Sequence, residues 1–140
     1  MKRLLASLCL GIALITTPIA FQSCTTVTPP TISVAATDQI ILRAEQTAEV
    51  AKTTFNTFVH LERDNEGLLK QASPQIHVWA ENIRRNGLNW IVSLRNATKD
   101  FKANRTAANQ ATLNTALITL TNAINETNRY ITQAKKVATP

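Results

Sequence analysis

The segment "PQIHVWAENIRRNGLNWIVSLRNATKDF", residues 74–101, decides the fold of this chain. Its apolar and small side chains recur every three or four residues, which is the spacing of one face of an α-helix. Ser73 precedes the segment as a candidate N-cap, and Pro74 stands at the first helical position, where its missing N–H is harmless. The segment therefore predicts an amphipathic helix over residues 74–102. Its stripe consists of Ile76, Trp79, Ala80, Ile83, Gly87, Trp90, Leu94, Ala97 and Phe101.

Two further apolar stripes flank this helix. They predict one helix over residues 38–71, with Thr37 as its N-cap, and another over residues 107–137. The first stripe is interrupted by Glu62 and Asn65 before it resumes. The chain has only 3 Gly and 5 Pro among 140 residues, which agrees with helices joined by short turns. The stripe members are Ile41, Ala44, Ala48, Ala51, Phe55 and Phe58 in the first helix, and Leu113, Ala116, Leu117, Leu120, Ile124, Thr127, Ile131, Ala134 and Ala138 in the third.

Short connections between long helices place consecutive helices antiparallel to one another. We therefore expect an all-α fold, an elongated antiparallel up-down-up three-helix bundle over residues 37–140. Folding the first two helices about residue 73 places Glu62 beside Arg84 or Arg85. Gly87 on the second stripe indicates a close approach between helices or, together with Asn86, a kink.

The N-terminal residues have the pattern of a secretory signal. Lys2 and Arg3 form a basic start, and the apolar run "LLASLCLGIALI" follows at residues 4–15. Residues 21–24 of the sequence "AFQSC" (20–24) then resemble the lipobox of bacterial lipoproteins, in which a small residue, here Ser23, precedes a cysteine. Ordinary cleavage after "PIA", or retention of the apolar run as a membrane anchor, are the alternatives.

The resemblance implies the following organisation. Residues 1–23 would be a signal peptide, and Cys24 would carry the lipid, including fatty acyl groups such as palmitate. Residues 24–36 would be a lipid-attached flexible tether, since "TTVTPPTISVAAT" is polar and contains Pro. Thr25, with no Asp after the cysteine, resembles the pattern of outer-membrane lipoproteins and implies the periplasmic side of the outer membrane. The membrane would then be one partner, through the lipid on Cys24.

The sequence contains no constellation that indicates catalysis, so we expect a protein that is not an enzyme and has no cofactor. His60 and His77 would lie roughly 13 Å apart along the hairpin, too far to share one zinc ion. We therefore predict no metal site. The net charge of +6 includes Lys2 and Arg3, and the other basic residues are scattered, so a nucleic-acid partner is not expected.

The residues most typical of a binding surface lie between residues 60 and 90. Trp and Arg are over-represented at binding hot spots, and two arginines can hold a carboxylate or a phosphate. The alternative is a solvated, salt-linked helix hairpin. The sequence predicts a lipid-anchored cell-envelope protein that acts as a helical spacer or protein-binding module, for another envelope protein or for itself. Its alternative role is to bind a small anionic ligand. The candidate residues are Glu62, Arg84, Arg85, Trp79 and Trp90.

Overall fold

The computed structural model describes residues 34–138. The chain divides into two units, Met1–Thr31 and Ile32–Pro140, and the described residues belong to the second. They form four helices, α1 (Val34–Asp64), α2 (Glu66–Ala72), α3 (Pro74–Ala103) and α4 (Ala107–Ala138), and they contain no strand. The predicted all-α class is confirmed for this part of the chain. The predicted signal segment and the lipid-attachment residue Cys24 lie outside the described residues.

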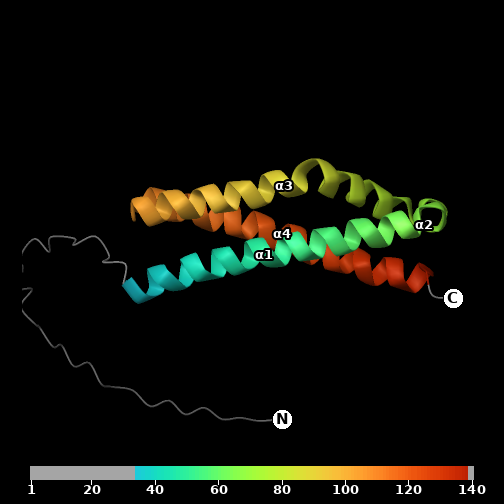
Figure 1. The fold of residues 1–140 in the computed structure, drawn as a ribbon, viewed down its shortest axis with the longest axis horizontal. Coiled ribbons are helices and arrows are strands. Elements are labelled where there is room, and N and C mark those ends of the chain that lie inside the picture. The colour runs from blue at the N-terminus through green and yellow to red at the C-terminus, as the bar shows by residue number, and fades with distance from the viewer. Residues whose placement is uncertain (1–33, 139–140) are drawn as a thin grey trace, which may run out of the picture. The chain divides into compact units, whose positions relative to one another are not determined.

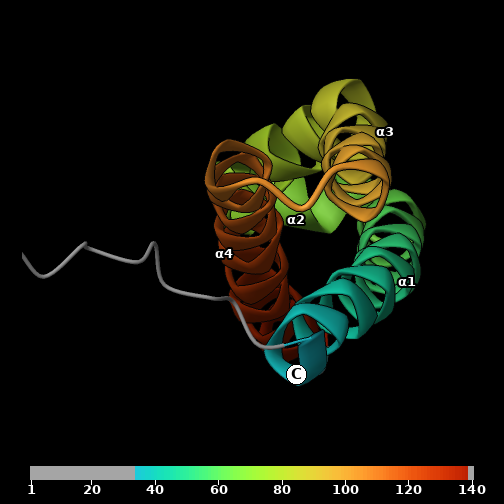
Figure 2. The ribbon, with the colours of Figure 1, turned by 90° about the vertical axis from the view of Figure 1, so that its left-hand side faces the viewer.

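The three long helices all pack against one another. In Figure 1, α1 and α4 run in the same direction and α3 runs in the opposite direction. The short α2 lies at the end of the bundle where the chain passes from α1 to α3. Seen from the end in Figure 2, the long helices occupy the corners of a triangle. Each contains about 30 residues, so each is roughly 45 Å long. The core is therefore a narrow column between three helices.

The first predicted helix differs from the structure at its start and in its interior. α1 begins at Val34, so residues 34–36 are helical, and Thr37 lies inside the helix, where it is buried. The predicted helix over residues 38–71 is divided at Asn65, whose backbone leaves the helical region at φ −123° and ψ 21°. The Asn65 side chain donates a hydrogen bond to the carbonyl oxygen of Leu61 at 2.9 Å. This bond supplies a partner for one of the last carbonyl groups of α1, which have no partner within the helix. The described residues therefore form four helices instead of the predicted three.

The other two helices follow their predicted bounds closely. Ser73 occupies the N-cap position of α3 and Pro74 the first turn, although the Ser73 side chain makes no capping hydrogen bond. α4 is preceded by Thr106, whose Oγ1 accepts a hydrogen bond from the backbone N–H of Asn109 at 3.2 Å. This contact satisfies one of the free N–H groups at the start of α4.

The core changes in width along the bundle. Between residues 44 and 51 the buried side chains of α1 are small, and after them α1 supplies the aromatic rings of Phe55 and Phe58. Gly87 of α3 is buried, and a Cβ atom at this position would lie 3.1 Å from Cδ2 of Phe55. The stripe glycine is therefore a point of close approach between α1 and α3, as one of the two interpretations of its position predicted. The buried small residues of α1 are Ala44, Ala48 and Ala51.

Candidate functional site

A fully buried carboxylate lies near the C-terminal end of α1. Glu62 is 0% exposed, and its two oxygens are bound by two residues of α3. Arg84 donates a hydrogen bond from Nη2 to Oε2, and Nδ1 of His77 lies 2.6 Å from Oε1. A carboxylate can be buried without a large penalty only when charged or hydrogen-bonding partners replace its water. The polar interruption of the first stripe is therefore the anchor point of α3 on α1, and of the two predicted arginine partners the structure selects Arg84.

Arg84 is shared between two carboxylates, because it also binds Glu81 on its own helix. Partial burial of the guanidinium group opposes its charge, but the hydrogen bonds to Glu62 and Glu81 and their negative charge outweigh this and raise the pKa of Arg84. The cation is thus held and neutralised from two sides. An incoming anion would have to displace a carboxylate to reach it.

Arg85 lies in a different environment from Arg84. It is exposed and borders a shallow depression of about 450 Å³ on the outer side of α3, beside Val78 and Glu81. Among the described residues no carboxylate forms an ion pair with it. The structure therefore does not bring Arg84 and Arg85 together into one anion-binding pair.

The two tryptophans belong to the core side of α3. Trp79 and Trp90 stack with their ring centroids 6.3 Å apart, and Trp79 also stacks on Tyr130 of α4 at 6.0 Å. Nε1 of Trp79 donates a hydrogen bond at 3.1 Å to Oγ1 of Thr127, which is fully buried. Both indoles are half-buried and pack against the core. They join the helices together, and the structure does not place them in the charged cluster around Glu62.

A further ion pair lies beside Glu62. Lys70 binds Glu66 within α2 at 2.6 Å, which lowers the pKa of Glu66 and raises that of Lys70. Glu62, Glu66 and His77 each have one potential metal-ligating atom within 4.8 Å of the others. Sequence reasoning considered only the two histidines and missed this group, because the group forms only when α2 and α3 fold back on the end of α1. Both carboxylates already have cationic partners, and this arrangement is typical of an ion-pair network.

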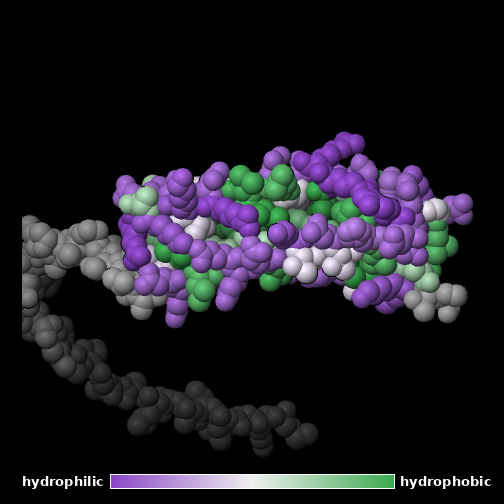
Figure 3. Space-filling model, viewed as in Figure 1, coloured by the Kyte–Doolittle hydropathy of each residue, from purple (hydrophilic) through white to green (hydrophobic). Residues whose placement is uncertain are grey.

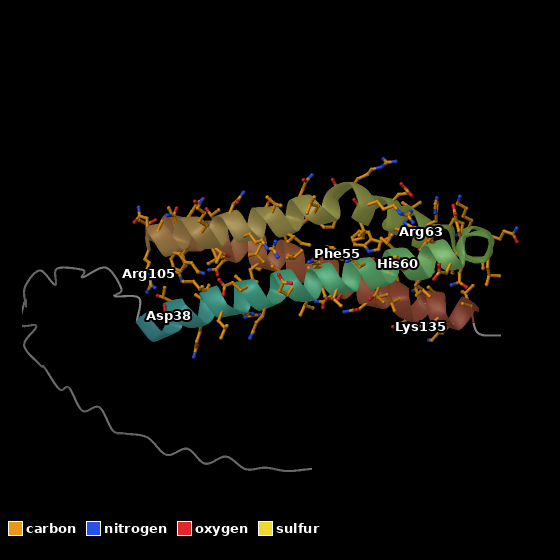
Figure 4. The ribbon with its side chains drawn as sticks, in the orientation of Figure 1. Asp38, Phe55, His60, Arg63, Arg105 and Lys135 are labelled. Carbon is orange, nitrogen blue, oxygen red and sulfur yellow. The ribbon has the colours of Figure 1, made fainter. Side chains whose placement is uncertain are left out.

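The polar groups of this region are satisfied. Within residues that the structure describes, no buried side-chain nitrogen or oxygen atom lacks a hydrogen-bond partner. His60, the second histidine, is exposed on α1 (Figure 4) and is not part of the group around Glu62. The cluster thus links the end of α1 to α3, and Arg85 and Val78 lie exposed next to it on α3.

Comparisons with protein-family models, with curated proteins and with solved structures give no match for this chain. Within residues 34–138, no helix combines the length and the apolar composition that crossing a bilayer requires. The function must therefore be inferred from the residues and their geometry.

Proposed function

We propose that this chain is a non-enzymatic, lipid-anchored protein of the bacterial cell envelope, on the periplasmic side of the outer membrane. Its lipid would be attached to Cys24, and its three long helices would act as an up-down-up rod, with α2 as part of the first turn. The rod would serve as a spacer or as a binding module for another envelope protein or for a second copy. The sequence around Cys24 supports the anchor, and the helical part supports the rod.

The observation that carries the proposal is that α1 extends along the bundle, from a start that is near the predicted lipid-attachment site in the sequence to the charged cluster at the other end. This helix starts at Val34, ten residues after Cys24, and its other end, near the cluster around Glu62, lies roughly 45 Å from its start. The residues between Cys24 and Val34 can reach at most roughly 35 Å, even when fully extended. Lipidation of Cys24 would thus tether the Val34 end of the rod and leave the α2 end available to partners.

The α2 end also has the surface that a protein partner prefers. Val78 is 66% exposed and Leu68 is 48% exposed, and Arg85 lies beside Val78. Arg is enriched at binding hot spots, and the exposed side chain of Val78 beside Arg85 adds apolar surface that a partner could cover. The alternative function, binding of a small anionic ligand at the end of the bundle that contains Glu62, Arg84 and Arg85, receives less support, because Glu62 and Glu81 already neutralise Arg84.

The anchor is tested by metabolic labelling with radioactive palmitate in a bacterial host that expresses the full chain. The wild type and the matched control Cys9→Ala should incorporate label, and Cys24→Ala should not. Cys9 lies within the apolar run and precedes the predicted cleavage site, so its loss should not affect lipid attachment. Equal label in the wild type and in Cys24→Ala would refute the anchor.

The binding end is tested by photo-crosslinking in cells. A photoreactive residue replaces Val78, or Ile118 of α4 as a control, because the two side chains are 66% and 61% exposed. We expect a discrete cross-linked product from position 78 only, lost when Arg85→Glu is added. A product that contains only this chain would identify self-association. Equal products from both positions, or none from either, would contradict a binding surface at the α2 end.

A further inference from the structure

A row of ion pairs follows the seam between α1 and α3. In each pair the acid lies on α1, and the base lies on α3 or directly after it. Figure 4 shows Asp38 and Arg105 at the end where α1 begins. Nη2 of Arg105 lies 3.0 Å from Oδ1 of Asp38. The other pairs are Glu45 with Lys102, Glu49 with Arg95, and Glu62 with Arg84.

The row is interrupted between Glu49 and Glu62. There α1 presents Lys52 in place of an acid, and α3 presents Leu88, which is 71% exposed. Among the described residues no carboxylate forms an ion pair with Lys52. At this point of the seam the ion pairs are therefore replaced by one exposed apolar side chain, Leu88, and one cation without an acidic partner, Lys52.

A groove of about 510 Å³ lies at this interruption. Because Gly87 has no side chain, the ring of Phe55 forms its floor, together with Ile91. Figure 4 places Phe55 in the half of α1 nearer to α2, and Figure 3 shows apolar surface among polar residues on the face where α1 and α3 meet. The volume lies within the range of sites for small molecules.

The charged residues that line the groove are all basic. Its titratable lining residues are Lys52, Arg84 and Arg95, and no described acid lines it. Arg84 and Arg95 are bound by carboxylates outside the groove, which leaves Lys52 as the lining cation without an acidic partner. An occupant therefore gains by bringing one negative charge to Lys52 and by covering the apolar surface of Leu88 and Phe55.

The size of the groove favours a small occupant. The pairs made by Arg84 and Arg95 cross the seam at its two ends, and these residues are roughly 16 Å apart along α3. A helix of a partner protein would have to extend past these crossings. We propose that the groove binds a small amphipathic anion, a monocarboxylate with a single aliphatic chain. Its carboxylate pairs with Lys52, and its chain lies over Phe55 and Leu88. This site lies outside the α2 end and does not depend on the lipid at Cys24.

The proposal is tested by titrating the purified full chain with decanoate, with decyltrimethylammonium as the cationic counterpart and acetate as the head group alone. Isothermal titration calorimetry gives the Kd. Tryptophan fluorescence gives a second readout, because the ring of Trp90 contacts Phe55 edge-on at 6.1 Å. We expect saturable one-to-one binding of decanoate, at least tenfold tighter than that of decyltrimethylammonium, and no saturation with acetate.

Two groove variants, Lys52→Glu and Leu88→Glu, should each raise the Kd for decanoate at least tenfold. The controls Lys136→Glu and Ile118→Glu, which change a similar charge and a similarly exposed apolar residue on α4, should not. Circular dichroism verifies that each variant is folded, and Lys52→Gln replaces Lys52→Glu if the latter is not. Equal affinity for the anion and the cation, or unchanged Kd values in the groove variants, would overturn the proposal. The proposal would also be overturned if the wild type formed a dimer that bound no decanoate and if Leu88→Glu dissociated that dimer. The groove would then be an interface between two copies of the chain.

Discussion

The two neighbouring arginines of α3 should differ sharply in their effect on stability. Arg84→Ala removes the partner of Oε2 of Glu62, a carboxylate that is 0% exposed, whereas Arg85→Ala removes an exposed side chain with no ion pair among the described residues. Removing one partner of a fully buried ion pair costs about 3–5 kcal/mol. The side chain of Arg84 is 28% exposed and that of His77 is 27% exposed, so water reaches the site and His77 remains bound to Oε1. We therefore expect Arg84→Ala to lower the free energy of unfolding by about 2–3 kcal/mol.

Urea denaturation followed by far-UV circular dichroism measures this difference. With a urea m-value of about 2 kcal/mol/M, a loss of about 2–3 kcal/mol lowers the midpoint by roughly 1–1.5 M. Arg85→Ala should change the free energy of unfolding by less than about 0.5 kcal/mol. The variant Glu62→Leu/Arg84→Met, which replaces the pair by apolar side chains, should regain most of the loss. Equal losses in the two single arginine variants, or a double variant as unstable as the sum of its single changes, would refute a stabilising role of the pair.

Three further outcomes follow from the structure. Gly67→Ala should raise the free energy of unfolding by about 0.5–1 kcal/mol, because a Cβ atom there meets no atom within 4 Å. Gly87→Ala should give a free energy of unfolding at least about 1 kcal/mol below that of Gly67→Ala, because its Cβ atom would lie 3.1 Å from the ring of Phe55. A higher melting temperature for Gly87→Ala than for Gly67→Ala would contradict this. Trp79→Phe should cost about 1–2 kcal/mol in urea denaturation, because it removes the hydrogen bond to Thr127; no change would show that the bond contributes nothing. Because the pKa of Glu66 is lowered in the folded state, the unfolded state binds more protons below neutrality, and the contribution of this carboxylate is lost as the pH falls through its lowered pKa. The melting temperatures of the wild type and Glu66→Gln should therefore converge in acid, and a constant difference would contradict that sign.

The helical stripes were predictable because burial in this fold follows a single period. In α1, the stripe from Ile41 to Phe58 is buried throughout, and the stripes of α3 and α4 are buried or half-buried. A helix that packs on two neighbours shows the same face to both, so the spacing of apolar residues is sufficient to identify it. The all-α class thus depends on local sequence alone.

The features that depend on neighbouring helices were predicted less well. The break at Asn65 coincides with the interruption of the first stripe, but periodicity does not distinguish a continuous polar turn from a chain that ends one helix and begins another. In the same way, a hairpin register that is uncertain by a few residues does not choose between Arg84 and Arg85. The groove beside Gly87 was missed because it depends on which residues of α1 lie opposite α3.

The seam between α1 and α3 separates residues that stabilise the fold from residues that can bind. Glu62 is buried and neutralises Arg84, so changes there should act first on unfolding. Lys52 and Arg85 border different depressions, and no described carboxylate pairs with either, so changes there should act on binding. Effects at separate sites without shared partners are additive. Lys52→Glu should weaken decanoate binding and leave the cross-link at position 78 intact, and Arg85→Glu should do the reverse. If either variant abolishes both decanoate binding and the cross-link, the groove and the α2 end belong to one site, and both proposals are wrong. If each variant abolishes only the readout of its own site, the two sites are independent.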